Sequence, residues 1–352
     1  ENSWRLLPRA TDMMSTQEGY RYPPTGCLRE GTSVSQPVKL ESTTALSQAD
    51  VHAIALLVER ATELDGVRPL SEQVMLSLLS NTGTPTEHIC AWRGATLVGY
   101  ASLLRVSGAE AASVEIAVDE QGRRLGVAGE ILDQALRETS GYLQLWAHGH
   151  SATTAQLAQS RGFIKVRELY RMRRPLTGDL SGGRLPKSIA IRPFDATRDT
   201  DDWLELNARA FVDLPDQGGW TRGDLEARLN EDWFDPAGFL LAHEVQRDGS
   251  QGALVGFHWT KIHHHEHTSD ADNEDLGEVY VLGIDPQRQA QGLGRVLTMA
   301  GLRYLRDQGL SEVMLHVESD NAAALATYER LGFTRFDTDT LYRSPVPARP
   351  PG

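Results

Sequence analysis

The chain has 352 residues, of which 40% are hydrophobic and 24% are charged, so it is expected to be an ordinary globular protein of two domains. Its formal net charge of -13 argues against partners such as nucleic acid or an anionic membrane surface. Only two cysteines occur, Cys27 and Cys90, which excludes a disulfide framework and a thiolate metal cluster and fits a reducing cytoplasm.

Residues 1–40 contain scattered Pro, Gly, Ser and Arg without periodicity, and they lack the apolar core of a signal peptide. We expect a disordered or loosely attached tail there. The chain begins with Glu1 rather than Met, and Met13 and Met14 are alternative starts. No apolar run is long enough to span a bilayer, so no membrane association is expected.

The first half of the chain mixes helical and strand patterns. Residues 50–64 are apolar at helical spacing, and residues 72–79 predict a second helix. A hydrophobic strand ends in the Val-Gly-aromatic step at 97–100, and residues 114–128 predict a strand followed by a turn. Elements in this order predict an α/β domain of the α+β type, with a mostly antiparallel central sheet flanked by helices.

The second half repeats the first. Residues 114–128 align with 280–294 without a gap, and Arg-Gly-Phe at 161–163 matches Leu-Gly-Phe at 331–333. The segment between the halves, residues 176–188, has the composition of a flexible linker. We therefore predict tandem domains at 41–175 and 189–345, followed by a short tail at 346–352.

The strongest motif of the second half is a glycine-containing turn between a strand and a helix. The strand is predicted at 278–282 and the helix at 295–302, and the turn has the spacing Gln289-x-x-Gly292-x-Gly294. Exposed main-chain N–H groups at a helix N-terminus can bind a pyrophosphate. The spacing differs from the Rossmann pattern, and the turn has no Gly-Lys-Ser/Thr of a P-loop.

This turn resembles the acetyl-CoA pyrophosphate loop of the GNAT acetyltransferases. The segment N-x-x-A-x-x-x-Y-x-x-x-G-F at 321–333 is similar to the later helix of that family, which flanks the pantetheine arm and carries a tyrosine near the thioester sulfur. The resemblance implies two tandem GNAT domains, with acetyl-CoA as cosubstrate and no metal.

By the same resemblance, the acetyl-CoA contacts would be mostly main-chain groups. In the second half they are Leu282, Gly283, Ile284, Gln289, Ala290, Gln291, Gly292, Leu293, Gly294, Arg295 and Asn321. In the first half the corresponding residues are Ile116, Ala117, Val118, Arg124, Leu125, Gly126, Val127, Ala128 and Gly129.

Acetyl transfer to an amine needs a base for the attacking amine and an acid for the leaving thiolate. Glu278 and Tyr328 stand at the matching positions of the second half, whereas the aligned residues of the first half are Ala112 and Ala158. We therefore expect the second half to be the catalyst and the first to be a degenerate half that can still hold acetyl-CoA. The alternatives are that Glu278 is a solvated strand residue and that Tyr328 only packs.

A closer resemblance covers residues 45–343 and is to the mycothiol synthase family. It is carried by residues 65–73, 146–149, 172–176, 215–221, 256–261 and 277–286. It implies acetylation of the cysteine α-amine of cysteinyl-glucosaminyl-inositol by a cytoplasmic enzyme, which we expect to be a monomer. The implied acceptor contacts are Glu72, Asp216, Lys261, Glu278 and His316, with Asp216 in place of a glutamate and His316 in place of a tyrosine.

Other interpretations stay open. Glu72 could simply favour a helix start that Ser71 caps, and Lys261 could be a strand-end charge. The run His-His-His-Glu-His at 263–267 suggests a metal, but its position in an acidic stretch between strands fits an exposed loop better. The competing functions are acetylation of another small amine and a non-catalytic acyl-CoA-binding regulator.

Overall fold

Twelve strands form one mixed sheet in the computed structural model, which describes residues 36–80, 86–105, 111–180, 185–263 and 275–345. The predicted tails at 1–35 and 346–352 lie outside the described residues, as do Cys27 and both alternative start methionines. Strand β1 (Val38–Thr43) includes residues 38–40, which the sequence had placed in the tail.

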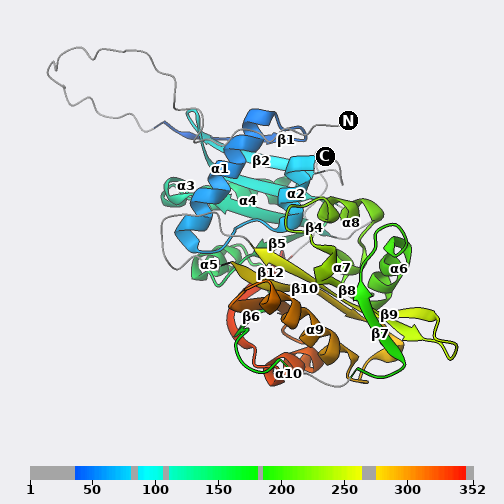
Figure 1. Ribbon diagram of the computed structural model, residues 1–352. Helices are drawn as coiled ribbons and strands as arrows, with labels where there is room; N and C mark the ends of the chain where they lie inside the picture. The colour runs from blue at the N-terminus through cyan, green and yellow to red at the C-terminus, as the bar shows by residue number, and fades with distance from the viewer. Residues whose placement is uncertain (1–35, 81–85, 106–110, 181–184, 264–274, 346–352) are drawn as a thin grey trace, which may run out of the picture. The chain divides into compact units, whose positions relative to one another are not determined.

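Both halves use the same order of strands and main helices, with additional short helices in the second half (Figure 1), which confirms the internal repeat. After β1 the first half has α1 (Gln48–Asp65), α2 (Glu72–Ser80), β2 (Thr86–Arg93), β3 (Thr96–Leu104), β4 (Ala111–Val118), α3 (Glu120–Arg124), α4 (Val127–Glu138), β5 (Tyr142–Ala147), α5 (Ala152–Ser160) and β6 (Ile164–Pro175). The second half has β7 (Ile189–Pro193), α6 (Thr200–Ala210), α7 (Pro215–Gly218), α8 (Arg222–Leu229), η2 (Pro236–Gly238), β8 (Phe239–Val245), β9 (Gln251–His263), β10 (Leu276–Ile284), η3 (Pro286–Arg288), α9 (Leu293–Asp307), β11 (Glu312–Glu318), α10 (Ala322–Arg330) and β12 (Thr334–Arg343).

The two predicted helices of the first half are α1 and α2. Helix α1 begins with a capping box between Ser47 and Asp50, and it ends at Gly66, whose φ of 66° is left-handed. Helix α2 begins at Glu72, where the Ser71 Oγ accepts a hydrogen bond from the Val74 N–H at 3.3 Å. The predicted cap at Ser71 is therefore present.

The two halves exchange their last strands. The strand order is β1-β2-β3-β4-β5-β12-β6-β11-β10-β9-β8-β7. Strand β12 of the second half pairs with β5 of the first, β6 of the first half pairs with β11 of the second, and β6 and β12 pair with each other. Among the described ladders only β4–β5 and β10–β11 are parallel, so the sheet is mostly antiparallel, as predicted. Contacts group residues 38–352 as one unit, and the division at 176–188 stays a prediction.

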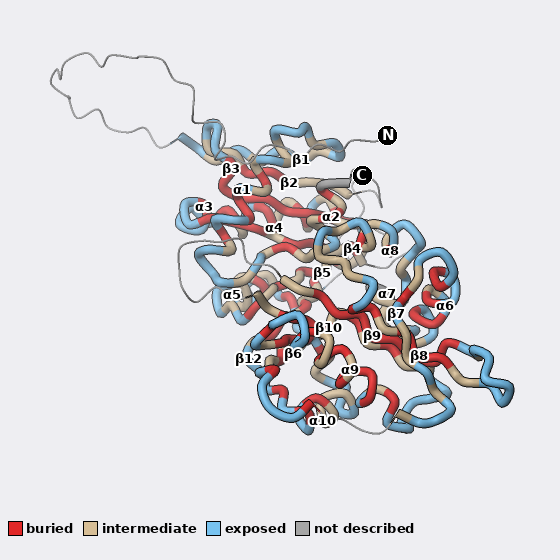
Figure 2. The backbone as a smooth tube through the Cα atoms, in the orientation of Figure 1, coloured by how far each residue is buried: buried red, intermediate tan, exposed pale blue. Residues whose placement is uncertain are grey.

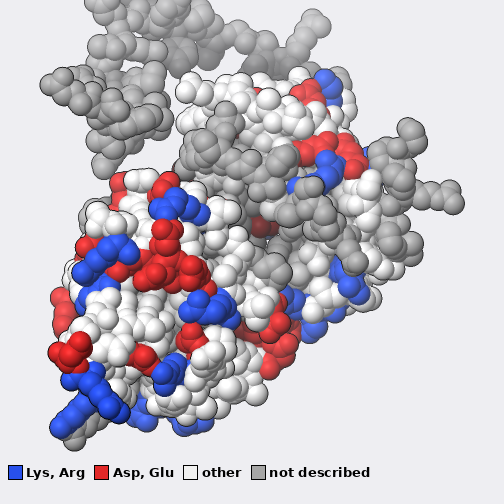
Figure 3. Space-filling model, turned by 90° about the vertical axis from the view of Figure 1, so that its right-hand side faces the viewer, with Lys and Arg blue, Asp and Glu red and all other residues white. Residues whose placement is uncertain are grey.

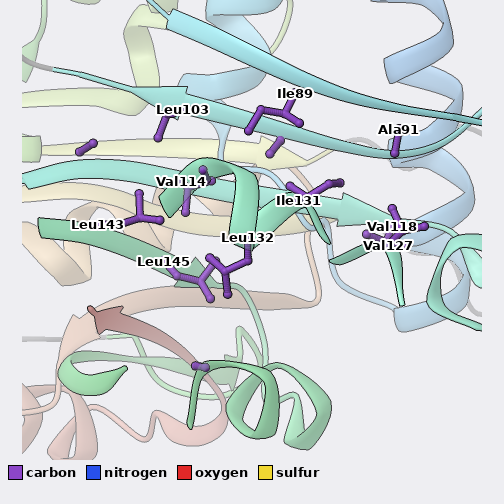
Figure 4. Packing of buried hydrophobic residues seen from close by; sticks show 14 of the residues in the cluster. Ile89, Ala91, Leu103, Val114, Val118, Val127, Ile131, Leu132, Leu143 and Leu145 are labelled. Carbon is purple, nitrogen blue, oxygen red and sulfur yellow. The ribbon is translucent and has the colours of Figure 1, made fainter. Parts of the chain in front are cut away.

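Hydrophobic clusters lie on the sheet under the helices of each half. One cluster of the first half joins α4 and α5 to strands β2 to β5, and Figure 4 shows Ile131 and Leu132 of α4 beside the strand residues. A second cluster joins α1 and α2 to the sheet. Since helices cover both faces, β3 is buried at seven consecutive positions. In the second half, buried residues concentrate along β8, β9 and β10 (Figure 2).

Charged side chains of both signs are interspersed on the face of the molecule drawn in Figure 3. Acidic groups gather there with Lys and Arg side chains beside them, which agrees with the mixed composition of the chain. None of the helices in the described part of the chain combines the length and the apolar character that crossing a bilayer requires.

Candidate active site

The glycine-containing turn of the second half leaves open space beside its backbone. Gly292 caps α9 with a φ of 80°, a left-handed conformation that glycine adopts without strain. A Cβ atom on Gly292 would meet nothing within 4 Å, and one on Gly294 would meet only Ile284, at 3.7 Å. The first N–H groups of α9 lack partners within the helix, and the helix dipole there favours an anion. The predicted contacts from Gln289 to Arg295 lie in this turn, and their geometry fits a pyrophosphate.

Strands β10 and β11 separate beside this turn. Their parallel pairing covers only Gly277 to Val279 of β10, and from Val281 to Ile284 β10 pairs with β9 alone in the described ladders. A bulge at Tyr280 interrupts that second ladder. The main chain of residues 282–284, which the sequence assigned to the pantetheine, thus lies beyond the end of the β10–β11 ladder, and its contact with acetyl-CoA stays a prediction.

Two of the predicted contacts also have structural roles. A Cβ atom on Gly283 would lie 2.4 Å from the ring of Phe257, so packing alone requires glycine there. Asn321 caps α10, and its Oδ1 accepts a hydrogen bond from the Ala324 N–H at 3.0 Å. Packing and helix capping are thus enough to explain a glycine at 283 and an asparagine at 321, and the residue types alone are no evidence of acetyl-CoA binding.

Glu278 lies on β10 with only 6% of its surface exposed, between two imidazoles. His263 Nε2 is 2.7 Å from its Oε2, and His316 Nδ1 is 3.2 Å from its Oε1. Burial by itself would raise the pKa of this carboxyl, but the hydrogen bonds from His263 and His316 outweigh burial and hold the pKa well below its usual range. Glu278 is therefore ionised at neutral pH.

Residues of both halves meet beside Glu278. Lys261, the cross-strand partner of Glu278, forms an ion pair with Glu72 at the start of α2. The Glu72 carboxylate also accepts a hydrogen bond from the Tyr280 hydroxyl at 2.7 Å. The Lys261 ammonium lies 4.4 Å from the ring centroid of Trp233, a cation–π distance. Four of the five predicted acceptor residues thus gather in one place.

Arg228 on α8 completes this cluster. Its guanidinium donates to the Tyr280 hydroxyl at 2.7 Å and to Oε1 of Gln73 at 2.8 Å, and it lies 3.8 Å from the ring centroid of Trp220. Burial, and then the charge of Glu72, raise the pKa of Tyr280 well above its usual value. The remaining predicted acceptor residue, Asp216, lies in α7, and its side chain is outside the described part of the structure.

Sequence reasoning missed His263, Tyr280 and Arg228. His263 ends β9 two residues after Lys261, so strand alternation could have placed both side chains on one face. It was instead grouped with the histidine run, of which residues 264–267 lie outside the described residues together with Asp270, Asp272 and Glu274. No local signal marks Arg228.

Tyr328 on α10 is 8% exposed and packs edge-on against Phe333, with ring centroids 5.6 Å apart. It belongs to the hydrophobic cluster that contains Val279, with Leu282 packed against that cluster. Burial raises the pKa of Tyr328 to about 12. The hydroxyl is therefore protonated at neutral pH.

The first half keeps the turn but lacks the proton-transfer groups. Gly126 caps α4 with a φ of 75°, like its counterpart Gly292. Ala112 and Ala158, which align with Glu278 and Tyr328, are 4% and 0% exposed and belong to the hydrophobic core of that half. A Cβ atom on Gly129 would lie 2.7 Å from Arg161 Nη2.

Comparisons with known proteins agree with this geometry. The model of the acetyltransferase (GNAT) family matches residues 200–333. A GCN5-related N-acetyltransferase from Sphaerobacter thermophilus has a TM-score of 0.60 at 20% identity, covering 88% of this chain and 96% of that one. A tandem GNAT protein from the clavulanic acid biosynthesis pathway has a TM-score of 0.66 at 18% identity, covering 90% and 100%. The chain thus has a tandem GNAT fold.

Relatives that are more similar in sequence identify the family within this class. The mycothiol acetyltransferase of Thermobispora bispora is 44% identical over 294 residues, which is 84% of this chain and 96% of that protein. That of Thermomonospora curvata is 45% identical over 304 residues, or 86% and 96%. The chain belongs to the mycothiol acetyltransferase family, and it is an acetyl-CoA-dependent N-acetyltransferase. The family resemblance seen in the sequence is confirmed.

Proposed function

We propose that this enzyme acetylates the cysteine α-amine of cysteinyl-glucosaminyl-inositol to give mycothiol, with the second half as the catalyst. The observation that carries the proposal is the buried, ionised carboxylate of Glu278 beside a polar cluster that both halves build. An ammonium acceptor calls for carboxylates, and a polyhydroxylated sugar–inositol calls for several convergent polar groups. The relatives are mycothiol acetyltransferases, and from them we take mycothiol as the product.

In this proposal the Glu278 carboxylate takes the proton from the bound ammonium, directly or through water, and releases it to solvent. The amine nitrogen then bonds to the acetyl carbon while the carbon–sulfur bond breaks. Main-chain N–H groups of residues 282–284 stabilise the charge that develops on the carbonyl oxygen. Tyr328 donates its proton to the leaving thiolate of CoA and regains one from solvent.

The first half has a supporting role in the proposal. Ala112 and Ala158 can neither accept nor donate a proton, but Gly126 keeps the anion-binding geometry for a second acetyl-CoA. Its α2 helix supplies Glu72 to the acceptor cluster, the polar group of Glu72, Lys261, Tyr280 and Arg228 beside Glu278. This contribution gives the degenerate half a reason to persist.

The regulatory alternative would be favoured if Glu278 and Tyr328 were buried and paired elsewhere. Both are buried, and Glu278 is paired. Its partners, however, are the ring nitrogens of His263 and His316, on the neighbouring strands β9 and β11, and not a group that removes it from the cluster. Membership of an acetyltransferase family also supports turnover, so this alternative is the weaker one.

The first test is CoA release by the full chain with acetyl-CoA and cysteinyl-glucosaminyl-inositol, with mass spectrometry of the product. We expect an N-acetylcysteinyl product, and we expect Glu278→Gln to lower kcat about 10²–10⁴-fold, as loss of a general base does. Glu226→Gln, at an exposed position on α8, is the matched control. CoA release only with other amines would redirect the acceptor to an amino sugar or amino acid, and full activity in Glu278→Gln would exclude that carboxylate as the base.

A further inference from the structure

His148 lies between two carboxylates that come from different halves of the chain. Its Nε2 is 3.4 Å from Oε2 of Glu115 on β4, and its Nδ1 is 3.6 Å from Oδ2 of Asp339 on β12. The imidazole ring is stacked on Trp146, with ring centroids 6.1 Å apart, and 16% of its side chain is exposed. His148 was part of a family-like motif in the sequence but had no predicted role.

One arm of this arrangement reaches the acceptor cluster through the first half. The Glu115 carboxylate accepts hydrogen bonds from the Ser71 N–H at 2.5 Å and from the Ser71 hydroxyl at 2.8 Å. Ser71 immediately precedes α2, whose first residue is Glu72. Glu115 therefore fixes the end of the helix that carries Glu72 to Lys261 and Tyr280.

The other arm reaches the proposed base through the second half. Asp339 accepts a hydrogen bond from the Gly149 N–H at 2.7 Å, and its Oδ2 lies 3.7 Å from Nε2 of His316. The opposite nitrogen of His316 contacts Glu278. Asp339 thus lies at the nitrogen of His316 that faces away from Glu278 and helps to orient this imidazole.

The charges of this network depend on His148. Both of its ring nitrogens face carboxylates, and Glu115 and Asp339 are each only 7% exposed. Burial alone would lower the pKa of His148, but the flanking carboxylates of Asp339 and Glu115 outweigh it and raise that pKa to about 10. The same contacts lower the pKa of Asp339 against the effect of its burial. Without the imidazolium, two buried carboxylates would lose their shared cation.

We propose that His148 is a positioning residue for acetyl transfer, which holds Glu72 through Glu115 and His316 with Glu278 through Asp339. This inference rests on the proposed function, since it assigns the two ends of the network to one acceptor. The turn at residues 289–295 has no part in the network. His148 therefore acts on the acceptor side and leaves acetyl-CoA binding alone.

The test compares His148→Gln with His150→Gln, an exposed neighbour two residues away, in the full chain. We expect kcat/KM for the amine to fall about 10–100-fold in His148→Gln, as small misplacements of reacting groups do. The Kd for acetyl-CoA should stay within about twofold, because the network lies apart from the turn.

A purely structural role would lower the melting temperature of His148→Gln with kcat/KM and acetyl-CoA affinity unchanged at assay temperature, and that result would overturn the proposal. Imidazole NMR signals of His316 give a readout that needs no acceptor. They should shift in His148→Gln and stay in place in His150→Gln. If the wild type fails to turn over cysteinyl-glucosaminyl-inositol but the His316 signals shift as expected, the acceptor is wrong and the network stands. Unshifted signals would refute the network.

Discussion

In one buried network the pKa of the Glu278 carboxyl is lowered and the pKa of the His148 imidazole is raised. Hydrogen bonds from imidazoles keep the pKa of the Glu278 carboxyl well below its usual range, and two flanking carboxylates raise the pKa of His148 to about 10. In both cases burial opposes the charged form and the partners outweigh it. The fold thus favours the charged form of both residues.

Stability should therefore fall as the pH rises above neutrality. The pKa of His148 is raised from 6.5 in the unfolded chain, so its stabilisation is complete below about pH 6.5 and is lost as the pH rises through about 10. Urea unfolding at pH 7, 8 and 9 should show this loss in the wild type and a weaker dependence in His148→Gln. Equal slopes in the two proteins would show that His148 is not the group responsible.

At this scale the sequence predicted part of the site. Glu72, Lys261, Glu278 and His316 gather as the family resemblance implied. The residues around them, His263, Tyr280, Arg228 and Asp339, were missed, because side-chain pairing across distant strands leaves no mark in local spacing. Residue types show which proton transfers and hydrogen bonds are possible. Only the folded structure shows which side chains make them with one another.

The glycines of β10 and the following turn differ in what requires them. Gly294→Ala would place its Cβ in open space, 3.7 Å from Ile284, whereas Gly283→Ala would drive its Cβ into Phe257 at 2.4 Å. We expect Gly294→Ala to weaken acetyl-CoA binding with little change in melting temperature. Gly283→Ala should destabilise the fold by about 1–3 kcal/mol, as overpacking does. Calorimetric binding and thermal unfolding separate the two effects, and an unchanged acetyl-CoA Kd in Gly294→Ala would count against the predicted pyrophosphate contact.

Helix α2 connects the first half to the site of the second through Glu72. Glu72→Gln would leave Lys261, which is 9% exposed, without its carboxylate partner. We expect a loss of about 1–3 kcal/mol in unfolding free energy and a higher KM for the amine. Glu63→Gln, at an exposed position on α1, is the control for charge alone. A normal KM in Glu72→Gln would remove this residue from the acceptor site.

For the whole molecule, the repeat and the mixed sheet were readable from the sequence, because both halves carry the same pattern of turns and strands. The exchange of β6 and β12 was not, since each strand has the same alternating pattern whichever strand it pairs with. The exchange matters for the site because it places Asp339 of the second half beside His148 of the first.

Residues 38–175 and 189–345, produced as separate polypeptides, should not fold independently. Each would keep its own last strand but lack the strand of the other half that pairs with it. We expect neither fragment alone to unfold cooperatively, and we expect co-expression to recover a complex with acetyltransferase activity. A cooperative transition and a dispersed NMR spectrum from either fragment alone would contradict this expectation.

The exchanged strands also have a consequence during synthesis. The chain leaves the ribosome from its N-terminus, so β5 emerges early but meets its neighbour β12 only when almost the entire chain has been made. Until then an edge of the nascent first half exposes main-chain groups that could pair with another chain. An mRNA truncated before the codons of β12 would thus yield an aggregation-prone fragment. The two halves of the sheet can pair through β12 only after translation is nearly complete.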